Sequence, residues 1–144
     1  MSDYTAMCFR KMKESEKMAF LQIFAKMASI DGHFDECEKA FIMNAAIQMG
    51  VAIKKIAKIF DDFDEQKLLK KASAIKDRRV ALELIKELCY LAHTDEELSD
   101  EEVLFIGRIG EAMGIKPEKI EEISNWVIDR LIWLNQEKII FEEI

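Results

Sequence analysis

The chain has 144 residues, of which 50% are hydrophobic and 34% are charged, and its formal net charge is −7. This acidic balance argues against a nucleic-acid-binding protein, because such proteins neutralise phosphates with lysine and arginine. One proline and five glycines in the whole chain predict helices and exclude a sheet-rich fold, which needs many more turn residues.

The first predicted helix begins at Ser15, a residue type that suits the N-cap position, and carries apolar residues at three- and four-residue steps up to Ala28. Asp31-Gly32 then interrupts the periodicity and predicts a loop. A second helix begins at Asp35, which has the spacing of a capping box with Glu38. It ends at Gly50, where a left-handed backbone conformation favours glycine.

A polar helix is predicted from residues 61 to 76, with lysines along its outer side. The helix-capping and helix-ending residues of the first half then recur. Ser99 and Glu102 have the spacing of a capping box, and Gly114 ends the helix that they begin. The last predicted helix runs from Pro117 to about Gln136, with proline in the first turn, where its missing N–H is tolerated.

These recurrences indicate an internal duplication. A shift of 64 residues aligns segments 18–59 and 82–123 without an insertion or deletion. The identical pairs include polar residues and glycine as well as apolar ones: Ala28/Ala92, Asp31/Asp95, Glu38/Glu102, Phe41/Phe105, Ile42/Ile106, Met49/Met113, Gly50/Gly114, Lys55/Lys119, Ile56/Ile120 and Ile59/Ile123. Shared apolar periodicity alone is common among helical proteins, whereas Asp, Glu and Gly at fixed offsets favour a true repeat. We therefore expect one all-α domain over residues 1–144, built as a duplicated helical-hairpin bundle of about seven to eight helices.

The apolar pattern also predicts a core. We expect the following residues to be buried: Phe24, Phe41, Ile42, Leu88, Phe105, Ile106, Ile123 and Val127. Trp126 and Trp133 lie seven residues apart on one face of the last helix. Their spacing predicts packing into the core, and the alternatives are a ligand box and a seam between two copies of the chain.

Acidic residues around the two predicted loops are the candidate metal ligands: Asp31, Asp35, Glu38, Asp95 and Glu102. Six acids occupy the eight positions from Asp95 to Glu102. Such crowding costs electrostatic repulsion, which a divalent cation such as Ca²⁺ or Mg²⁺ relieves. If the two copies pack about a pseudo-two-fold axis, the two loops pool their carboxylates. The segment is not an EF-hand, since Met27 and Ser29 occupy its first and third ligand positions.

The alternative interpretation needs no metal. Glu38 and Glu102 then close capping boxes, and Asp31 accepts backbone N–H bonds at a helix corner. His33 and Cys37 lie four residues apart but lack a second ligand pair for zinc, and no orienting group makes them a nucleophile and base. No set of nucleophile, base and electrophile is visible, so we predict no enzyme activity. A deep pocket lined by acids and His33 or His93 would favour one.

At these residues the chain resembles the TerB-like family, named for a bacterial tellurite-resistance protein. The resemblance rests on the segments 27–32 and 49–51 with Glu38 between them, and on 91–95 and 113–115 with Glu102 between them. It implies an all-helical, internally duplicated domain connected with metal and stress responses in bacteria, without a secure enzymatic activity. One departure lies in the second loop, where Glu96 stands in place of Gly32.

The sequence thus predicts a non-enzymatic, stress-associated module that binds a divalent cation at two acidic loops. The alternative is a metal-free protein-interaction domain that uses its acidic and basic faces, the basic one extending from Lys67 to Arg79. Three irregularly spaced cysteines predict reduced thiols, and no signal peptide or long apolar run is visible. We therefore expect a cytoplasmic protein with an unknown protein partner, no nucleic acid and no membrane span.

Overall fold

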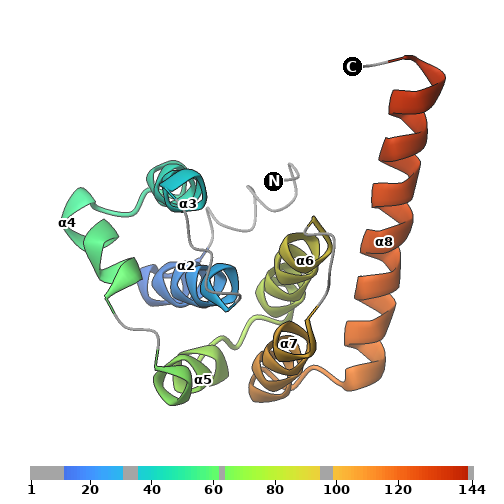
Figure 1. Cartoon of the computed structure of the whole chain (residues 1–144). Helices are drawn as coiled ribbons and strands as arrows, with labels where there is room; N and C mark the ends of the chain where they lie inside the picture. Colours follow the sequence, from blue (N-terminus) through green and yellow to red (C-terminus); the bar gives the residue numbers. More distant parts are fainter. Residues whose placement is uncertain (1–11, 31–35, 62–63, 95–98, 143–144) are drawn as a thin grey trace.

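The structure, a computed structural model, describes residues 12–30, 36–61, 64–94 and 99–142 (Figure 1). This part of the chain contains seven α-helices and one 3-10 helix, and no strand, which confirms the all-α prediction. In chain order the helices are α2 (Glu14–Ser29), α3 (Glu36–Gln48), α4 (Ile53–Ile56), the 3-10 helix η1 (Ala57–Phe60), α5 (Glu65–Ser73), α6 (Arg78–Thr94), α7 (Asp100–Ala112) and α8 (Pro117–Ile140).

The helices of the two repeats have equivalent bounds. A shift of 64 residues places the start of α2 on the start of α6, and it places α3 on α7 at both ends. Gly50 and Gly114 follow α3 and α7 with φ of +79° and +76°, a conformation that side chains with a Cβ rarely adopt. The next residue donates its N–H back into each helix, from Val51 to Ala46 O at 3.0 Å and from Ile115 to Gly110 O at 2.8 Å. Both helices therefore end in the same glycine-dependent turn.

Three predicted helix limits differ from the structure. The first helix begins at Glu14 and not at Ser15, because the Lys13 N–H donates to Glu16 Oε1 at 3.1 Å and closes the turn earlier. The polar helix predicted over 61–76 is shorter, since Asp64 caps it by accepting the N–H of Gln66 at 3.1 Å. The last helix continues past Gln136 to Ile140.

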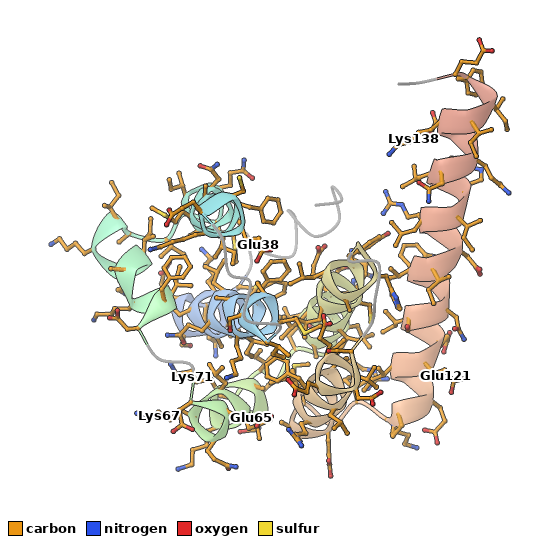
Figure 2. All side chains as sticks on the ribbon, viewed as in Figure 1. Glu38, Glu65, Lys67, Lys71, Glu121 and Lys138 are labelled. Carbon is orange, nitrogen blue, oxygen red and sulfur yellow. The ribbon has the colours of Figure 1, made fainter. Side chains whose placement is uncertain are left out.

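The central contacts join the two repeats. Helix α2 packs against α3, η1, α5 and α6, while α6 packs against α2, α7 and α8. Helix α5 lies against both α2 and α7 (Figure 1). Its Lys71 donates to Gln22 Oε1 at 2.6 Å, and its Glu65 accepts from Arg108 on α7 at 2.8 Å (Figure 2). The polar helix between the repeats thus connects the first repeat to the second.

The repeats diverge in their third helix. In the first repeat the chain leaves helical structure after η1 at Phe60, whereas α8 continues without a break for 24 residues. Figure 1 shows the carboxyl-terminal half of α8 projecting beyond the other helices, and Lys138 marks this half in Figure 2. Near the other end of α8, Gly110 permits a close approach of α7. A Cβ at that position would lie 2.3 Å from Ile120 Cδ1.

Most of the predicted core is confirmed. Ile42, Leu88, Phe105, Ile106 and Val127 are buried, and Phe24 and Ile123 are partly buried against the same cluster.

The prediction was wrong for Phe41, which is 57% exposed, whereas its equivalent Phe105 is 2% exposed. The reason lies in the neighbouring helices, because α5 packs against α7 while the closest neighbours of α3 are α2 and α4. Trp126 and Trp133 are 52% and 64% exposed, so their predicted core packing was also wrong. Trp126 makes an edge-to-face contact with Tyr90, at 6.5 Å between ring centroids.

The two equivalent phenylalanines provide a test of this packing. Phe105→Ala should lower the free energy of unfolding by about 3–5 kcal/mol, because it leaves a cavity in the core. Phe41→Ala should lower it by about 1 kcal/mol or less, since the ring is already largely in water. Urea denaturation of both variants measures the difference. Equal losses of unfolding free energy in the two variants would contradict this difference in packing between α7 and α3.

Candidate functional site

The predicted metal ligands are only partly described. Asp31, Asp35 and Asp95 lie outside the described residues, so the structure does not test the loop site. Glu102 is buried and closes a capping box, because its Oε1 accepts the Ser99 N–H at 3.2 Å and the Ser99 hydroxyl at 3.0 Å. Within the described ranges, no three His, Cys, Asp or Glu side chains lie close enough together to hold a metal. The capping interpretation is confirmed for Glu102, and the cation site stays a prediction.

A different site forms in the second repeat. A cavity of about 590 Å³ lies between α6, α7 and α8. Four buried residues form its floor and five exposed residues its rim, with His93, Ile120 and Ser124 between them. The floor consists of Cys89, Ala92, Ile106 and Ile115, and the rim of Val103, Gly107, Glu111, Pro117 and Glu121. Ligand pockets are typically about 300–1,000 Å³ in volume and mostly apolar, with a few polar groups that fix orientation. This cavity has both properties.

The helical period places these side chains together. Cys89, Ala92 and His93 occupy consecutive turns on one face of α6. On α8, Pro117, Ile120, Glu121 and Ser124 follow the same three- and four-residue steps, so one face of each helix lines the cavity.

Two polar side chains from different helices form a hydrogen bond on the wall of the cavity. His93 Nε2 on α6 and Ser124 Oγ on α8 lie 2.9 Å apart in a hydrogen bond, in which the donor depends on the tautomer of the imidazole. Burial lowers the pKa of His93, and the Glu102 carboxylate opposes this shift. The imidazole is therefore neutral near pH 7, so the pair presents hydrogen-bonding groups to the cavity without a positive charge.

Cys89 on the floor is a poor nucleophile. Burial raises the pKa of its thiol to about 11, and a hydrogen bond with Ser124 opposes the rise. A cysteine reacts as the thiolate, so this side chain is nearly all unreactive thiol at neutral pH. Cys37, one of the two residues that the sequence suggested for zinc, is exposed on α3.

The His93–Ser124 pair has the separation of a base and nucleophile, and no pattern in the sequence pointed to it. A pocket with His93 and two rim acids is part of what an enzyme would need. However, the nearby carboxylate oxygen Glu102 Oε1 is held by Ser99, and the described cavity lining contains no Lys or Arg to stabilise an oxyanion. The geometry is thus better suited to anchoring a ligand, and the absence of catalysis stays a prediction.

The first repeat contains an aromatic ring where the second has this cavity. A shift of 64 residues pairs Ser124 with Phe60 and Val103 with Lys39. Phe60 is partly buried against the core, and Lys39 Nζ lies 5.3 Å from the centroid of its ring. This contact joins α3 to η1, as the cavity joins α7 to α8. The sequence signal for this site is therefore a pair of aligned positions at which the first repeat has a large side chain and the second repeat has a small one.

The basic surface predicted between Lys67 and Arg79 is largely exposed. Lys70, Lys76 and Arg78 face solvent. Arg79, also exposed, pairs with the buried Glu83 at 2.9 Å, so part of its charge serves the fold. An acidic partner on this surface stays a prediction.

Comparisons with protein-family models, with curated proteins and with solved structures find no match to this chain. The TerB-like resemblance is therefore still an expectation from the sequence. Among the helices that the structure describes, none combines the length and the apolar character needed to cross a bilayer.

The cation site is tested by thermal unfolding after exhaustive chelation. If the acidic loops bind Ca²⁺ or Mg²⁺, a cation concentration of a hundred times Kd should stabilise the fold by about 2.7 kcal/mol. This corresponds to a rise in Tm on the order of 5–10 °C for a domain of this size.

Asp31→Asn combined with Asp95→Asn should abolish the rise. The matched control is Glu118→Gln combined with Asp129→Asn, which removes two exposed carboxylates on α8 outside both loops and should keep the rise. An unchanged Tm in the presence of either cation would mean that the acids serve only as caps and surface.

Proposed function

We propose that this chain is a non-enzymatic binding module whose ligand is a small, mainly apolar molecule held between α6, α7 and α8. The observation that carries the proposal is the cavity of about 590 Å³ with the His93–Ser124 hydrogen bond on its wall. The volume matches a drug-sized ligand, and the apolar floor supplies binding free energy through the hydrophobic effect. The polar pair fixes the orientation of the ligand.

The proposal agrees with the TerB-like resemblance, which implies a stress-associated domain without enzymatic activity. A divalent cation at the acidic loops belongs to the same family expectation. Those loops precede α3 and α7, and the cavity extends from His93 at the end of α6 and Val103 in the first turn of α7 to the first turns of α8. The candidate ligand Glu102 acts electrostatically on His93, so a cation at the second loop would lie close to the cavity wall.

Replacement of Ser124 tests the pocket. Ser124→Phe, which copies Phe60 of the first repeat, should occupy part of the cavity and weaken binding of the neutral apolar fluorophore N-phenylnaphthylamine. Ser124→Ala loses the same hydroxyl but keeps the space, so it should retain most of the fluorescence enhancement.

The proposal is wrong if the unaltered chain shows no saturable enhancement. It is also wrong if Ser124→Phe binds the probe as well as Ser124→Ala does.

Self-association through α8 is the second candidate function. The projecting half of this helix exposes Ile132, Trp133 and Ile139, and large exposed apolar surfaces commonly mark interaction sites. The partner that fits this surface is a second copy of the chain, since Trp126, Trp133 and Ile140 recur at seven-residue intervals typical of helix pairing.

If α8 forms this seam, sedimentation velocity should show a dimer at micromolar concentration, and Trp133→Glu should convert it to monomer by placing a charge in the seam. Phe41→Glu is the control, because Phe41 is a similarly exposed aromatic residue on α3. A monomer at all concentrations would exclude this candidate.

A further inference from the structure

The rim of the cavity carries negative charge. Glu111 on α7 and Glu121 on α8 are exposed side chains that line its opening. The described lining contains no Lys or Arg that would neutralise them. Along these helices Lys119 pairs with Glu122 at 2.9 Å and Arg108 pairs with Glu65 at 2.8 Å, while the exposed Lys116 lies in sequence between the lining residues Ile115 and Pro117. A ligand that enters therefore passes two carboxylates in the lining, and their negative potential attracts a cation.

The first repeat indicates what such a space accommodates. There the chain itself supplies an aromatic ring from Phe60 and an ammonium group from Lys39, with 5.3 Å between the ammonium nitrogen and the ring centroid. An ammonium group over an aromatic ring gains electrostatic stabilisation from the ring quadrupole. The second repeat lacks both groups, because Ser124 and Val103 occupy the equivalent positions.

The second repeat also gains two acids. Glu111 corresponds to Ile47, and Glu121 corresponds to Ala57. Relative to the first repeat, the second repeat therefore lacks the aromatic ring and the ammonium group of the protein itself. It has instead two carboxylates that attract a cationic ligand. These changes all affect side chains at one opening.

From this comparison of the repeats we propose that the cavity selects aromatic ligands that carry an ammonium group, and discriminates against aromatic carboxylates of the same size. The inference rests on the proposed function, since it names the class of ligand for that pocket. In the proposed complex the ring occupies the space above Cys89 and Ile106, which line the cavity. The ammonium group lies at the rim, where Glu111 and Glu121 attract it.

Three probes of the same ring and chain length test the selection: phenylbutylamine, phenylbutanol and phenylbutanoate. Competition against N-phenylnaphthylamine at low ionic strength gives the three affinities. We expect the amine to bind at least about tenfold more tightly than the carboxylate, with the alcohol between them, because two carboxylates attract one ligand and repel the other.

Glu111→Gln combined with Glu121→Gln should bring the amine-to-carboxylate ratio close to one and leave the affinity of the alcohol unchanged. The control is Glu101→Gln combined with Glu118→Gln. It removes the same charge from exposed positions on the same two helices outside the lining, and should preserve most of the ratio.

The outcomes separate the two proposals. If the alcohol binds but the amine and carboxylate bind equally, or the carboxylate binds better, the charge selection is overturned and the pocket proposal stands. If both double variants reduce the ratio equally, the net charge of the protein and not the rim governs selection, which also overturns the inference. If no probe binds to the unaltered chain, the pocket proposal itself fails.

Discussion

The packing of α6 against α2 is the contact on which the rest of the structure depends. Each of these helices is the first of its repeat, and together they bury the largest share of the core, including Ile23, Leu84 and Leu88. Helix α6 also contacts α7 and α8 with its other faces, so its packing against α2 positions these two helices as well. One face of α6 carries Cys89 and His93 to the floor and wall of the cavity. The helix that packs against the first repeat thus also contributes one wall of the candidate site.

Duplication explains how a cavity arises in so regular a bundle. The second helices of the repeats, α3 and α7, have equivalent limits and end in the same glycine turn, whereas the third helices differ in length and continuity. In the first repeat Lys39 and Phe60 make a contact between α3 and η1. In the second, the aligned residues Val103 and Ser124 line the cavity instead. An empty apolar space forgoes packing energy, which is a cost that a bound molecule offsets.

The two kinds of polar group at the site have different physical roles. His93 and Ser124 satisfy each other in a partly buried position, where an unpaired polar group would be costly. Glu111 and Glu121 are exposed at the rim, so their field reaches a ligand through water and is screened by salt. In the proposed complex, recognition on the wall would depend on geometry, and recognition at the rim on charge.

The sequence alone determined the helical class and most of the core, because helical periodicity, capping residues and glycine turns are local features of the chain. It also identified the capping role of Glu102. It did not determine which side of each helix is covered, since Phe41 and Phe105 are identical in type and differ in the helices that pack around them. Nor did it identify the cavity, whose lining comes from three helices and whose polar pair joins residues 93 and 124. Only tertiary packing brings such residues together, because their proximity depends on how α6 and α8 lie against each other and not on any local pattern.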